Sequence, residues 1–530
     1  MQYKFFPHTE EDIKLQYITP AIVGKWNQRK ITMETQITDG RINLKGNMVF
    51  REAPKRADYI LYLNDNNPIA IVEAKDNTHS VSYGLQQAMT YAQMLDLPFA
   101  YSSNGDGFTE HDFLTGKERQ LGLDEFPTEE ELITRFKGEK NNGEGLSLEQ
   151  EKVINQPYHS SQNTYSPRYY QRIAINRTVD AIAKGQDRIL LVMATGTGKT
   201  YTAFQIVYRM LQSGMKHKIL YLADRNILVD QTIQQDFAPL EKVIHKINVA
   251  KDDKTTITSH EVYFSLYQQL VGDDDKEHYS ELFSPDFFDL IIVDECHRGS
   301  AKEESRWRRI LEYFKSATQI GMTATPRETR YVSNIEYFGE PVYSYSLKEG
   351  IQDGFLAPFK VINIMTDIGD GWRPRRGQRD IYGNEIEDRV CNNSDYDYNI
   401  ILEDRIYQVA SEITNYLKNT DRMAKTIVFC ATEDAAERMR QELVNLNSDM
   451  DSECIVRITG SDDYGKKKLD YFISVASKYP VIATTSKLLS TGADCKMTKL
   501  IVLDEMVNSM TEFKQIIGRG TRLREKDGKT

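Results

Sequence analysis

The stretch RILLVMATGTGKT, residues 188–200, decides the fold of the central part of the chain. Its first half is short and almost wholly apolar, as is typical of a strand buried in a parallel sheet. The strand runs directly into a glycine-rich turn, and an amphipathic stretch follows at 201–214. A strand, a glycine-rich turn and a helix in this order predict a P-loop, whose backbone cradles the phosphates of a nucleotide.

The residues of this turn suit the binding of ATP and Mg²⁺, although Met193 or Ala194 stands where the strict pattern has a first glycine. The two glycines let the backbone approach a polyphosphate and point its N–H groups at it. The lysine should reach the β- and γ-phosphates, and the threonine after it should hold Mg²⁺. A chance glycine-rich turn is the alternative, which the flanking strand and helix disfavour. The expected contacts are Thr195, Gly196, Thr197, Gly198, Lys199 and Thr200.

Apolar runs alternate with amphipathic helices around the P-loop, and a second block later in the chain repeats the scheme. Short apolar strands between helices indicate a parallel sheet that is covered on both faces. The pattern therefore predicts two tandem parallel-sheet domains with a cleft between them. The other runs of the first block are 218–224, 289–295 and 318–325, and those of the second are 425–431, 453–459, 480–485 and 499–505.

A pair of acids, Asp294 and Glu295, stands at the end of the apolar run LIIV. Ligands gather at the carboxyl ends of parallel strands, so we expect this pair to lie beside the P-loop. Asp294 suits the binding of Mg²⁺, and Glu295 suits the polarisation of the attacking water. A solvated acid pair at a strand end is the alternative, and the P-loop upstream makes it the weaker one.

The segment QIIGRGTR, residues 515–522, carries Arg519 and Arg522. On a helical turn, residues three apart share one face. Across a cleft from the P-loop, the two side chains would act as arginine fingers that neutralise charge on the transferring phosphoryl group. Arginines on a solvated helix face are the alternative. The finger interpretation is favoured only because the P-loop and the acid pair occur in the same chain.

The first block of the chain holds a different set of charged residues on two strand-like runs, 57–63 and 69–75, which predict a β-hairpin. Glu73 and Lys75 are two apart on a strand and project together. Asp58, at the start of its strand, would lie opposite the end of the other strand. Two such carboxylates can hold Mg²⁺ for phosphate chemistry, with the lysine orienting a water. A chance ExK motif is the alternative, since such short motifs are common.

A helical pattern near 82–95 follows this hairpin, and a helix-like stretch at 9–26 precedes it. In the former, Gln87 and Tyr91 are four residues apart and would share one helix face. A further metal ligand could come from an acid earlier in the chain, and the sequence does not choose among Glu10, Glu11 and Glu34.

The length of 530 residues predicts about three domains, at 1–150, 151–360 and 361–530. KGEKNNGEGLSLEQEK, from 137 to 152, predicts a linker, and the polar residues 366–399 predict an insertion at the hinge. The net charge of −11 argues against a surface coated in nucleic-acid-binding charge but allows a local basic groove.

Other classes of protein are disfavoured by what the sequence lacks. The five cysteines show no ligand spacing, so we expect neither a zinc site nor a disulfide framework. The first residues lack the basic and apolar regions of a signal peptide, and no apolar run approaches the ~20 residues of a membrane span. These features favour a cytoplasmic protein that makes no contact with membrane.

The chain resembles the superfamily 2 helicases over roughly residues 165–525, where eight motifs fall in that family's order. They are Gln171, ATGTGKT (194–200), ADRNILVDQ (223–231), DECH (294–297), TATP (323–326), IVFC (427–430), TTSKLLSTGAD (484–494) and QIIGRGTR (515–522). The resemblance implies two RecA-like domains that clamp ATP and walk on DNA. It does not by itself imply strand separation.

The same resemblance assigns roles to residues outside the P-loop. It implies that Gln171 reads adenine, and that Thr323 and Thr325 couple the nucleotide state to the grip on DNA. It also implies that Gly492 and Asp494 sense the nucleotide from the second domain.

In the first block, the set Asp58, Glu73-x-Lys75, Gln87 and Tyr91 resembles the PD-(D/E)xK nucleases, in particular their RecB-like branch. Ala57 replaces the proline that usually precedes the aspartate. The implied fold class is α/β, with a PD-(D/E)xK nuclease-like α/β domain followed by two tandem RecA-like parallel-sheet domains.

A nuclease of this type before such a motor resembles the restriction subunit of type I restriction-modification enzymes. TEEDIKLQYITPAIVGKW (9–26) and GWRPRRGQRDIYGNEIED (371–388) are similar to that family's opening and interdomain insertion. The resemblance implies ATP and Mg²⁺ as cofactors, and double-stranded DNA and methyltransferase and specificity subunits as partners. The family normally continues with a helical assembly domain, so the chain is expected to be a fragment.

Two other functions stay open at this point. The first is a remodelling or repair translocase of superfamily 2 whose first domain only binds DNA or protein. The second is an ATP-gated scaffold without turnover, which the intact Glu295 and the pair Arg519 and Arg522 disfavour.

Overall fold

The chain forms two compact units in its computed structural model. The described residues are 8–45, 48–64, 66–139, 147–161, 166–223, 229, 232–252, 257–272, 277–296, 301–324, 328–329, 332–364, 371–392, 395–396, 400–460, 462–486, 495–507 and 509–523. The predicted division into three domains stays a prediction. The first unit comprises Met1–Arg41, Arg51–Met193 and Gly198–Ser346, and the second comprises Ile42–Phe50, Ala194–Thr197 and Leu347–Thr530.

A six-stranded sheet opens the first unit, in the order β1-β4-β5-β6-β7-β8. β4 and β5 form the predicted antiparallel hairpin, with Tyr59 opposite Val72, and β5 pairs in parallel with β6. The strands are β1 Ile31–Gln36, β4 Arg56–Asn64, β5 Asn67–Ala74, β6 Phe99–Ser103, β7 Phe108–Asp112 and β8 Lys117–Leu121.

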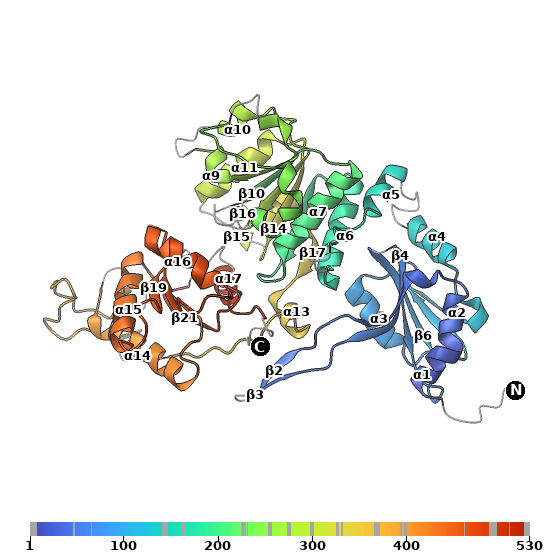
Figure 1. The fold of residues 1–530 in the computed structure, drawn as a ribbon, viewed down its shortest axis with the longest axis horizontal. Coiled ribbons are helices and arrows are strands. Elements are labelled where there is room, and N and C mark those ends of the chain that lie inside the picture. Colours follow the sequence, from blue (N-terminus) through green and yellow to red (C-terminus); the bar gives the residue numbers. More distant parts are fainter. Residues whose placement is uncertain are drawn as a thin grey trace. The chain divides into compact units, whose positions relative to one another are not determined.

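Helices cover both faces of this sheet (Figure 1). On one face, Ile18, Ile22 and Trp26 pack against the sheet. On the other face, Ala88 and Ala92 pack against it. The predicted helices are confirmed as α1 Glu10–Ile13, a π-helical segment Lys14–Ile18, α2 Thr19–Val23 and α3 Leu85–Leu95.

The predicted linker at 137–152 is wrong in part. Helix α4 (Glu129–Glu139) ends inside it and helix α5 (Leu148–Ile154) begins inside it. Ser147 caps α5 by accepting a hydrogen bond from the backbone N–H of Gln150, and Val153 and Ile154 are buried. A capped helix with a buried apolar end is an ordered element, which a composition rich in charge, Gly and Asn does not reveal.

The second sheet of the first unit has seven strands, in the order β11-β12-β10-β13-β14-β9-β17. Every neighbouring pair of strands in it is parallel, as the apolar runs predict. The strands are β11 Ile244–Lys246, β12 Val262–Leu266, β10 Ile219–Ala223, β13 Leu290–Asp294, β14 Thr318–Thr323, β9 Arg188–Met193 and β17 Pro341–Tyr345.

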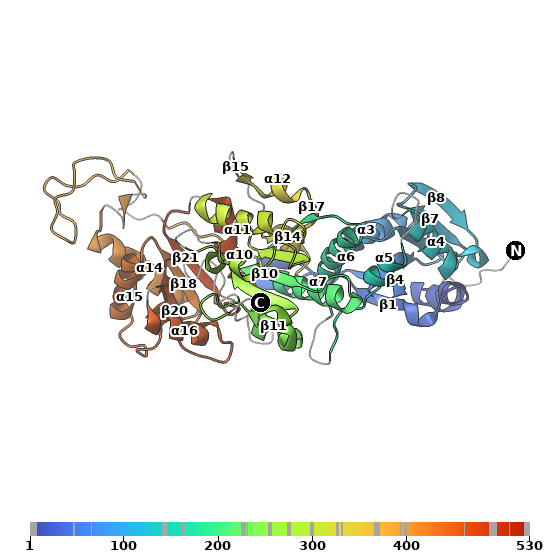
Figure 2. The same ribbon diagram turned by 90° about the horizontal axis from the view of Figure 1, so that it is seen from above.

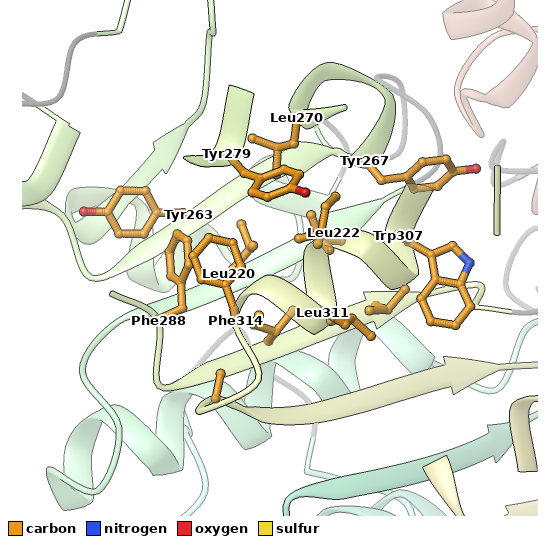
Figure 3. Packing of buried hydrophobic residues seen from close by; sticks show 14 of the residues in the cluster. Leu220, Leu222, Tyr263, Tyr267, Leu270, Tyr279, Phe288, Trp307, Leu311 and Phe314 are labelled. Atoms are coloured by element: carbon orange, nitrogen blue, oxygen red, sulfur yellow. The ribbon is translucent and has the colours of Figure 1, made fainter. Parts of the chain in front are cut away.

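An aromatic-rich core holds this sheet to its helices (Figure 3). Tyr263, Phe288, Trp307 and Phe314 are almost fully buried in it, together with aliphatic side chains of β10. Figure 2 shows α6 and α7 side by side. The helices are α6 Tyr169–Ala183, α7 Lys199–Ser213, α9 Tyr267–Leu270, α10 His278–Leu282, α11 Ala301–Tyr313 and α12 Asn334–Phe338.

The second unit contains a four-stranded parallel sheet in the order β19-β20-β18-β21, which confirms the second parallel-sheet block. The described part of the predicted insertion is closed by a β-bridge between Trp372 and Cys391, and Ile386, Cys391 and Tyr396 are buried in a small core. The strands and helices of the second unit are β2 Ile42–Lys45, β3 Met48–Arg51, β18 Thr426–Cys430, β19 Ile455–Arg457, β20 Ile482–Thr485, β21 Leu500–Asp504, α13 Leu347–Gln352, α14 Glu403–Asn419, α15 Glu433–Leu446, α16 Asp463–Ile473 and α17 Met510–Ile517.

The thiols of the five cysteines are buried and form no disulfide. In the described part of the chain, no helix has the length and apolar character that crossing a membrane requires.

Within the first unit, asparagines of the β4–β5 turn tie the six-stranded sheet to the helices of the seven-stranded sheet. Asn66 is buried, and its Nδ2 donates to the carbonyl of Gln156 at 2.6 Å. The Oδ1 of Asn66 accepts from the backbone N–H of Tyr158 at 3.2 Å. Asn176 of α6 donates through Nδ2 to the carbonyl of Asn66 at 3.0 Å. The β4–β5 turn therefore also holds the six-stranded sheet against α6 and the segment that precedes it.

Arg209 of α7 completes this junction and is fully buried. It donates to the carbonyl of Ile154 at 2.5 Å and to Oδ1 of Asn176 at 2.8 Å. Its guanidinium also lies over the Tyr158 ring, 5.3 Å from the centroid. Because α7 begins at Lys199, the helix that follows the P-loop is fixed to the hairpin of the first sheet.

We expect Arg209→Met to lower the urea midpoint of the unfolding transition of the first unit. The substitution removes a charged donor from the carbonyl of Ile154, which keeps Asn67 Nδ2 at 3.4 Å, and from Oδ1 of Asn176, which keeps the Tyr158 hydroxyl at 2.8 Å. Each lost hydrogen bond to a charged group costs ~1.5–3 kcal/mol. Urea unfolding followed by circular dichroism measures the shift. Arg375→Met, at an exposed position of the second unit, is the control. Equal midpoints for the two variants would contradict the junction.

Candidate nuclease and nucleotide sites

Asp58 and Glu73 converge where β4 begins and β5 ends, as the sequence predicts. The backbone N–H of Ala74, next to Glu73, donates to Oδ2 of Asp58 at 2.7 Å. This bond fixes the Asp58 carboxylate against the end of β5. Both acids are buried, Glu73 with a relative exposure of 1%.

Glu73 is the more confined of the two acids. Its Oε1 is buried and has no hydrogen-bond partner among the residues that the structure describes. Burial raises the pKa of Glu73 well above its ordinary range, and the charge of Asp58 adds to the rise, while Lys75 opposes it. A buried pair of acids with an unsatisfied oxygen is the kind of site that a divalent cation stabilises.

The donor set fits Mg²⁺ or Mn²⁺ held by two carboxylates. Nowhere among the described stretches do three or more His, Cys, Asp or Glu side chains converge into a metal site. Asp58 and Glu73 would therefore supply two ligands. Mg²⁺ commonly keeps several waters and binds through one or two carboxylates, so such a set is sufficient.

Lys75 follows β5 and reaches the same edge of the sheet. Its stem passes over Gly84, which precedes α3: a Cβ on that glycine would lie 3.3 Å from Cγ of Lys75 and 2.9 Å from Oγ of Ser102. The close approach requires a glycine at this position. The ammonium of Lys75 lies 3.8 Å from Oε2 of Glu10.

Gln87 and Tyr91 share one face of α3, as predicted. The Nε2 of Gln87 donates to Oη of Tyr91 at 3.5 Å. Burial raises the pKa of Tyr91, and the negative charge of Glu73 raises it further, which places the phenol close to that acid. The structure therefore brings together all five residues predicted for this site.

Lys14 also belongs to the site, although the sequence analysis missed it. Its ammonium is 2.6 Å from Oδ1 of Asp58 and 2.6 Å from Oε1 of Glu34. It also pairs with Glu11 at 3.1 Å and Glu10 at 3.4 Å. Burial alone would lower the pKa of Lys14, but the bonds to Asp58 and Glu34 outweigh burial and raise it. In the sequence, a lysine three and four residues after two acids is typical of an ordinary surface ion pair on a helix.

The nucleotide site begins at the P-loop, between β9 and α7. Gly196 and Gly198 have φ angles of 86° and 84°, in the left-handed region that favours glycine. The Nζ of Lys199 donates to the carbonyl of Met193 at 3.4 Å and lies 3.3 Å from Oε1 of Glu295. Helix α7 begins at Lys199, two residues before the predicted start at 201, so Lys199 and Thr200 form its first turn.

The acid pair lies at the carboxyl end of β13. Asp294 accepts hydrogen bonds from Oη of Tyr221 at 2.9 Å and from the backbone N–H of Glu295 at 2.9 Å. Glu295 has a φ of 52°, a left-handed conformation that non-glycine residues rarely adopt outside functional sites. Desolvation raises the pKa of Asp294, the charge of Glu295 adds to this, and Lys199 opposes it. Lys199, Asp294 and Glu295 therefore interact electrostatically with one another, and this arrangement suits the binding of Mg²⁺–ATP.

Gln171 lies against the P-loop. A Cβ on Gly198 would come within 2.4 Å of its Nε2. Its Oε1 accepts a hydrogen bond from the backbone N–H of Arg168 at 3.0 Å. The contact with adenine stays a prediction.

The predicted helical turn for Arg519 and Arg522 is wrong. Helix α17 ends at Ile517 with Gly518 as its C-cap, and both arginines follow it. Backbone N–H groups of Arg519 and Gly520 close turns on the last helical residues, so the pair does not share a helix face.

In the second unit, which includes Ala194–Thr197, the P-loop residues approach these arginines. A Cβ on Gly196 would lie 3.4 Å from Cγ of Arg522, and one on Gly518 would lie 2.6 Å from Cβ of Thr195. Thr197 donates through Oγ1 to the carbonyl of Ala194 at 2.6 Å, which closes the turn.

Other residues of the helicase resemblance divide into two groups. Thr323 is buried at the end of β14. Thr325, Gly492 and Asp494 lie outside the described residues, as do 224–228 and 230–231 of the third motif.

Two family models match the chain. The model of the Type I restriction enzyme R protein N terminus matches residues 21–127. The model of the Type III restriction enzyme res subunit matches residues 164–328. The first match covers Asp58, Glu73 and Lys75, and the second covers Lys199 and Asp294.

Three relatives extend this likeness. A solved fragment assigned as the HsdR subunit of a type I restriction enzyme from Vibrio vulnificus has a TM-score of 0.81 and 40% identity, over 99% of this chain and 92% of that one. The type I restriction enzyme EcoAI endonuclease subunit of Escherichia coli is 49% identical over 98% of this chain and 65% of its own length. The EcoKI endonuclease subunit is 29% identical over 89% of this chain and 46% of its own length.

We expect Mn²⁺ affinity at the Asp58–Glu73 pair to rise with pH. Because the folded-state pKa of Glu73 is raised above 4.5, this acid keeps its proton in the metal-free protein at pH values above 4.5, and a metal must displace that proton. The same shift means that the metal-free fold loses stability as the pH rises from the ordinary pKa of Glu73 to its raised pKa in the folded protein. Titration calorimetry in buffers of different ionisation enthalpy measures both affinity and proton release.

Glu73→Gln should remove the metal binding and the proton release together. Glu130→Gln, on the exposed surface of α4, should bind as the parent does. A pH-independent affinity in the parent would contradict the expectation.

Proposed function

Because the chain belongs to the family of type I restriction enzyme R subunits, we propose that it is the ATP-driven DNA motor and endonuclease of such an enzyme. One observation carries the proposal: the first unit holds two separate acid pairs with lysines, one at the P-loop and one on the first sheet. The chain spans 65% and 46% of the two Escherichia coli subunits, so the activity and partners of a whole subunit are proposals here.

In the proposed motor, the P-loop and Lys199 hold the phosphates, and Thr200 and Asp294 hold Mg²⁺. Glu295, already 3.3 Å from Lys199, orients the attacking water once the nucleotide takes up the lysine. Arg519 and Arg522 serve as the cations that stabilise the transferring phosphoryl group. Gln171 contacts adenine. Gly492 and Asp494 sense the nucleotide from the second domain. Thr323 and Thr325 couple the nucleotide state to the grip on DNA.

Lys199→Ala should abolish DNA-stimulated ATP hydrolysis, because it removes the fixed positive charge from the phosphate site. A coupled phosphate-release assay with and without duplex DNA measures the rate. Lys184→Ala removes a surface lysine that pairs only with Asp180 in the same domain, and should hydrolyse ATP as the parent does. Turnover of the Lys199 variant at the parental rate would overturn the motor.

In the proposed nuclease, Asp58 and Glu73 would hold Mg²⁺, and the bound ion would supply Lewis-acid polarisation of the scissile phosphate and a more acidic water. Lys75 is held over Gly84 at the same edge, where it can orient that water. Gln87 and Tyr91 line the α3 side of the pair. The proposed substrate is double-stranded DNA, and the proposed partners are methyltransferase and specificity subunits in the cytoplasm.

Asp58→Ala should remove DNA cleavage and leave ATP hydrolysis intact, since the two acid pairs are separate. The assay reconstitutes the complete enzyme with its methyltransferase and specificity subunits on unmethylated DNA, and follows cutting and ATP turnover in parallel. Glu130→Ala is the matched control at an exposed acid. Lys75→Ala should also stop cutting while leaving Mn²⁺ binding in place.

Parental cutting by the Asp58 variant would show that the first domain only binds DNA or protein. The chain would then be a remodelling or repair translocase, with ATP hydrolysis intact.

A further inference from the structure

Lys14 is a buried cation that the proposed nuclease chemistry does not use. Its side chain has a relative exposure of 3%, and its Nζ is 2.6 Å from both Asp58 Oδ1 and Glu34 Oε1. Lysine is almost never fully buried unless it is paired. Here four acids surround one ammonium, with Glu10 and Glu11 as the outer pair.

Two unusual backbone features bring this cluster together. Glu34 has a φ of 49°, and the pairing of β1 with β4 passes from Met33 opposite Tyr59 to Thr35 opposite Ala57 without it. Lys14 opens the π-helical segment between α1 and α2. A non-glycine residue in the left-handed region is strained and persists only where its surroundings hold it. Isolated π-turns also occur frequently at functional sites.

We propose that Lys14 is a positioning residue that occupies the place of a second divalent cation, so that the nuclease site binds one metal ion at Asp58 and Glu73. The inference rests on the proposed nuclease function and specifies its metal stoichiometry. Two-metal sites that act on phosphodiesters hold their ions roughly 3.5–4 Å apart, with carboxylates shared between them. Asp58, in contact with the Lys14 ammonium on one oxygen, is the acid that would be shared here.

Geometry and charge both exclude a second ion while Lys14 is present. Mg²⁺ approaches its oxygen ligands to about 2.0–2.1 Å, in the space that the ammonium already fills between Asp58 and Glu34. The first ion keeps access to Asp58, because a carboxylate has about four lone-pair sites. Lys14 and the Ala74 N–H take one site on each oxygen.

Removal of the ammonium would leave Asp58 and Glu34 facing one another without their shared cation, beside Glu10 and Glu11. Two neighbouring carboxylates without a shared cation disfavour the ionisation of both acids unless another cation enters. A divalent ion suits the oxygens that remain. The proposal therefore predicts that loss of a positive side chain adds a metal site.

The experiment counts Mn²⁺ ions on the full chain without nucleotide, by electron paramagnetic resonance and titration calorimetry. Every protein compared, the parent included, carries Asp294→Asn, so that the nucleotide site adds no ion to the count. The parent should bind one ion that Glu73→Gln removes. Lys14→Met and Lys14→Gln should each bind two, and Lys14→Arg should bind one. Addition of Glu34→Gln to Lys14→Met should return the count to one, because Glu34 serves only the second place.

One ion in a folded Lys14→Met variant, or two in the parent, would overturn the proposal. If neither uncharged variant folds, the count in the parent still decides, with one ion supporting the proposal and two contradicting it. A parent that binds no ion at Glu73 would instead refute the metal site of the proposed nuclease. The two failures are thus distinguishable.

Discussion

A buried carboxylate must find a cation or keep a proton, and both candidate sites are built around this requirement. In the nuclease site, Asp58 pairs with Lys14 at 2.6 Å, while Glu73 is left with an unsatisfied oxygen. In the nucleotide site, Lys199 lies 3.3 Å from Glu295. In each pair one acid, Glu73 or Asp294, still has its pKa raised by desolvation and by its neighbour. The lysines beside each pair, Lys14 and Lys75 at the first and Lys199 at the second, therefore do not offset the burial of both acids, and each site favours a divalent cation.

Sheet topology explains why the acids stand where they do. The interior positions of β5 and β13 are almost wholly buried by apolar contacts, so a charge can be tolerated only near a strand end. At the end of β13, parallel neighbours bring the acids beside the P-loop. At the end of β5, the antiparallel partner β4 begins, and its backbone register places Asp58 there. Two different pairing modes therefore produce the same arrangement of two acids and a lysine.

Local patterns in the sequence predicted what local geometry determines. Period-2 spacing on β5 placed Glu73 with Lys75, i,i+4 spacing on α3 placed Gln87 with Tyr91, and the P-loop pattern placed Lys199. Lys14 could not be predicted, because its role depends on Glu34, whose left-handed backbone has no signal in its residue type. The same holds for Asn66, in the turn of the predicted hairpin. Its buried hydrogen bonds depend on Gln156, which follows α5, and on Asn176 of α6, 90 and 110 residues away in the chain.

The misplaced helix for Arg519 and Arg522 has a related cause. The pattern QII continues the helix, but Gly518 and Gly520 follow it, and a Cβ on either would meet Thr195 or Ile501 at 2.6 Å or 3.2 Å. The glycines serve close packing of the chain after α17, and this packing ends the helix. The motif match assumed a helical turn through both arginines, but two glycines follow Ile517, and glycine is a poor helix former that commonly ends helices. The finger role of Arg519 and Arg522 stays a prediction.

The junction inside the first unit has a mechanical consequence. The P-loop is followed by α7, Arg209 of α7 binds the carbonyl of Ile154, and Asn176 and Asn66 extend the network to the β4–β5 turn. Rotation of the first sheet against α7 would break several buried hydrogen bonds at once, each leaving a group whose desolvation costs about 1–3 kcal/mol. The first sheet is therefore expected to move with α7 as one body when a nucleotide acts on the P-loop. Because the attachment is rigid, the acid pair of β4 and β5 would move together with the proposed first motor domain. No separate signal between the two sheets is needed.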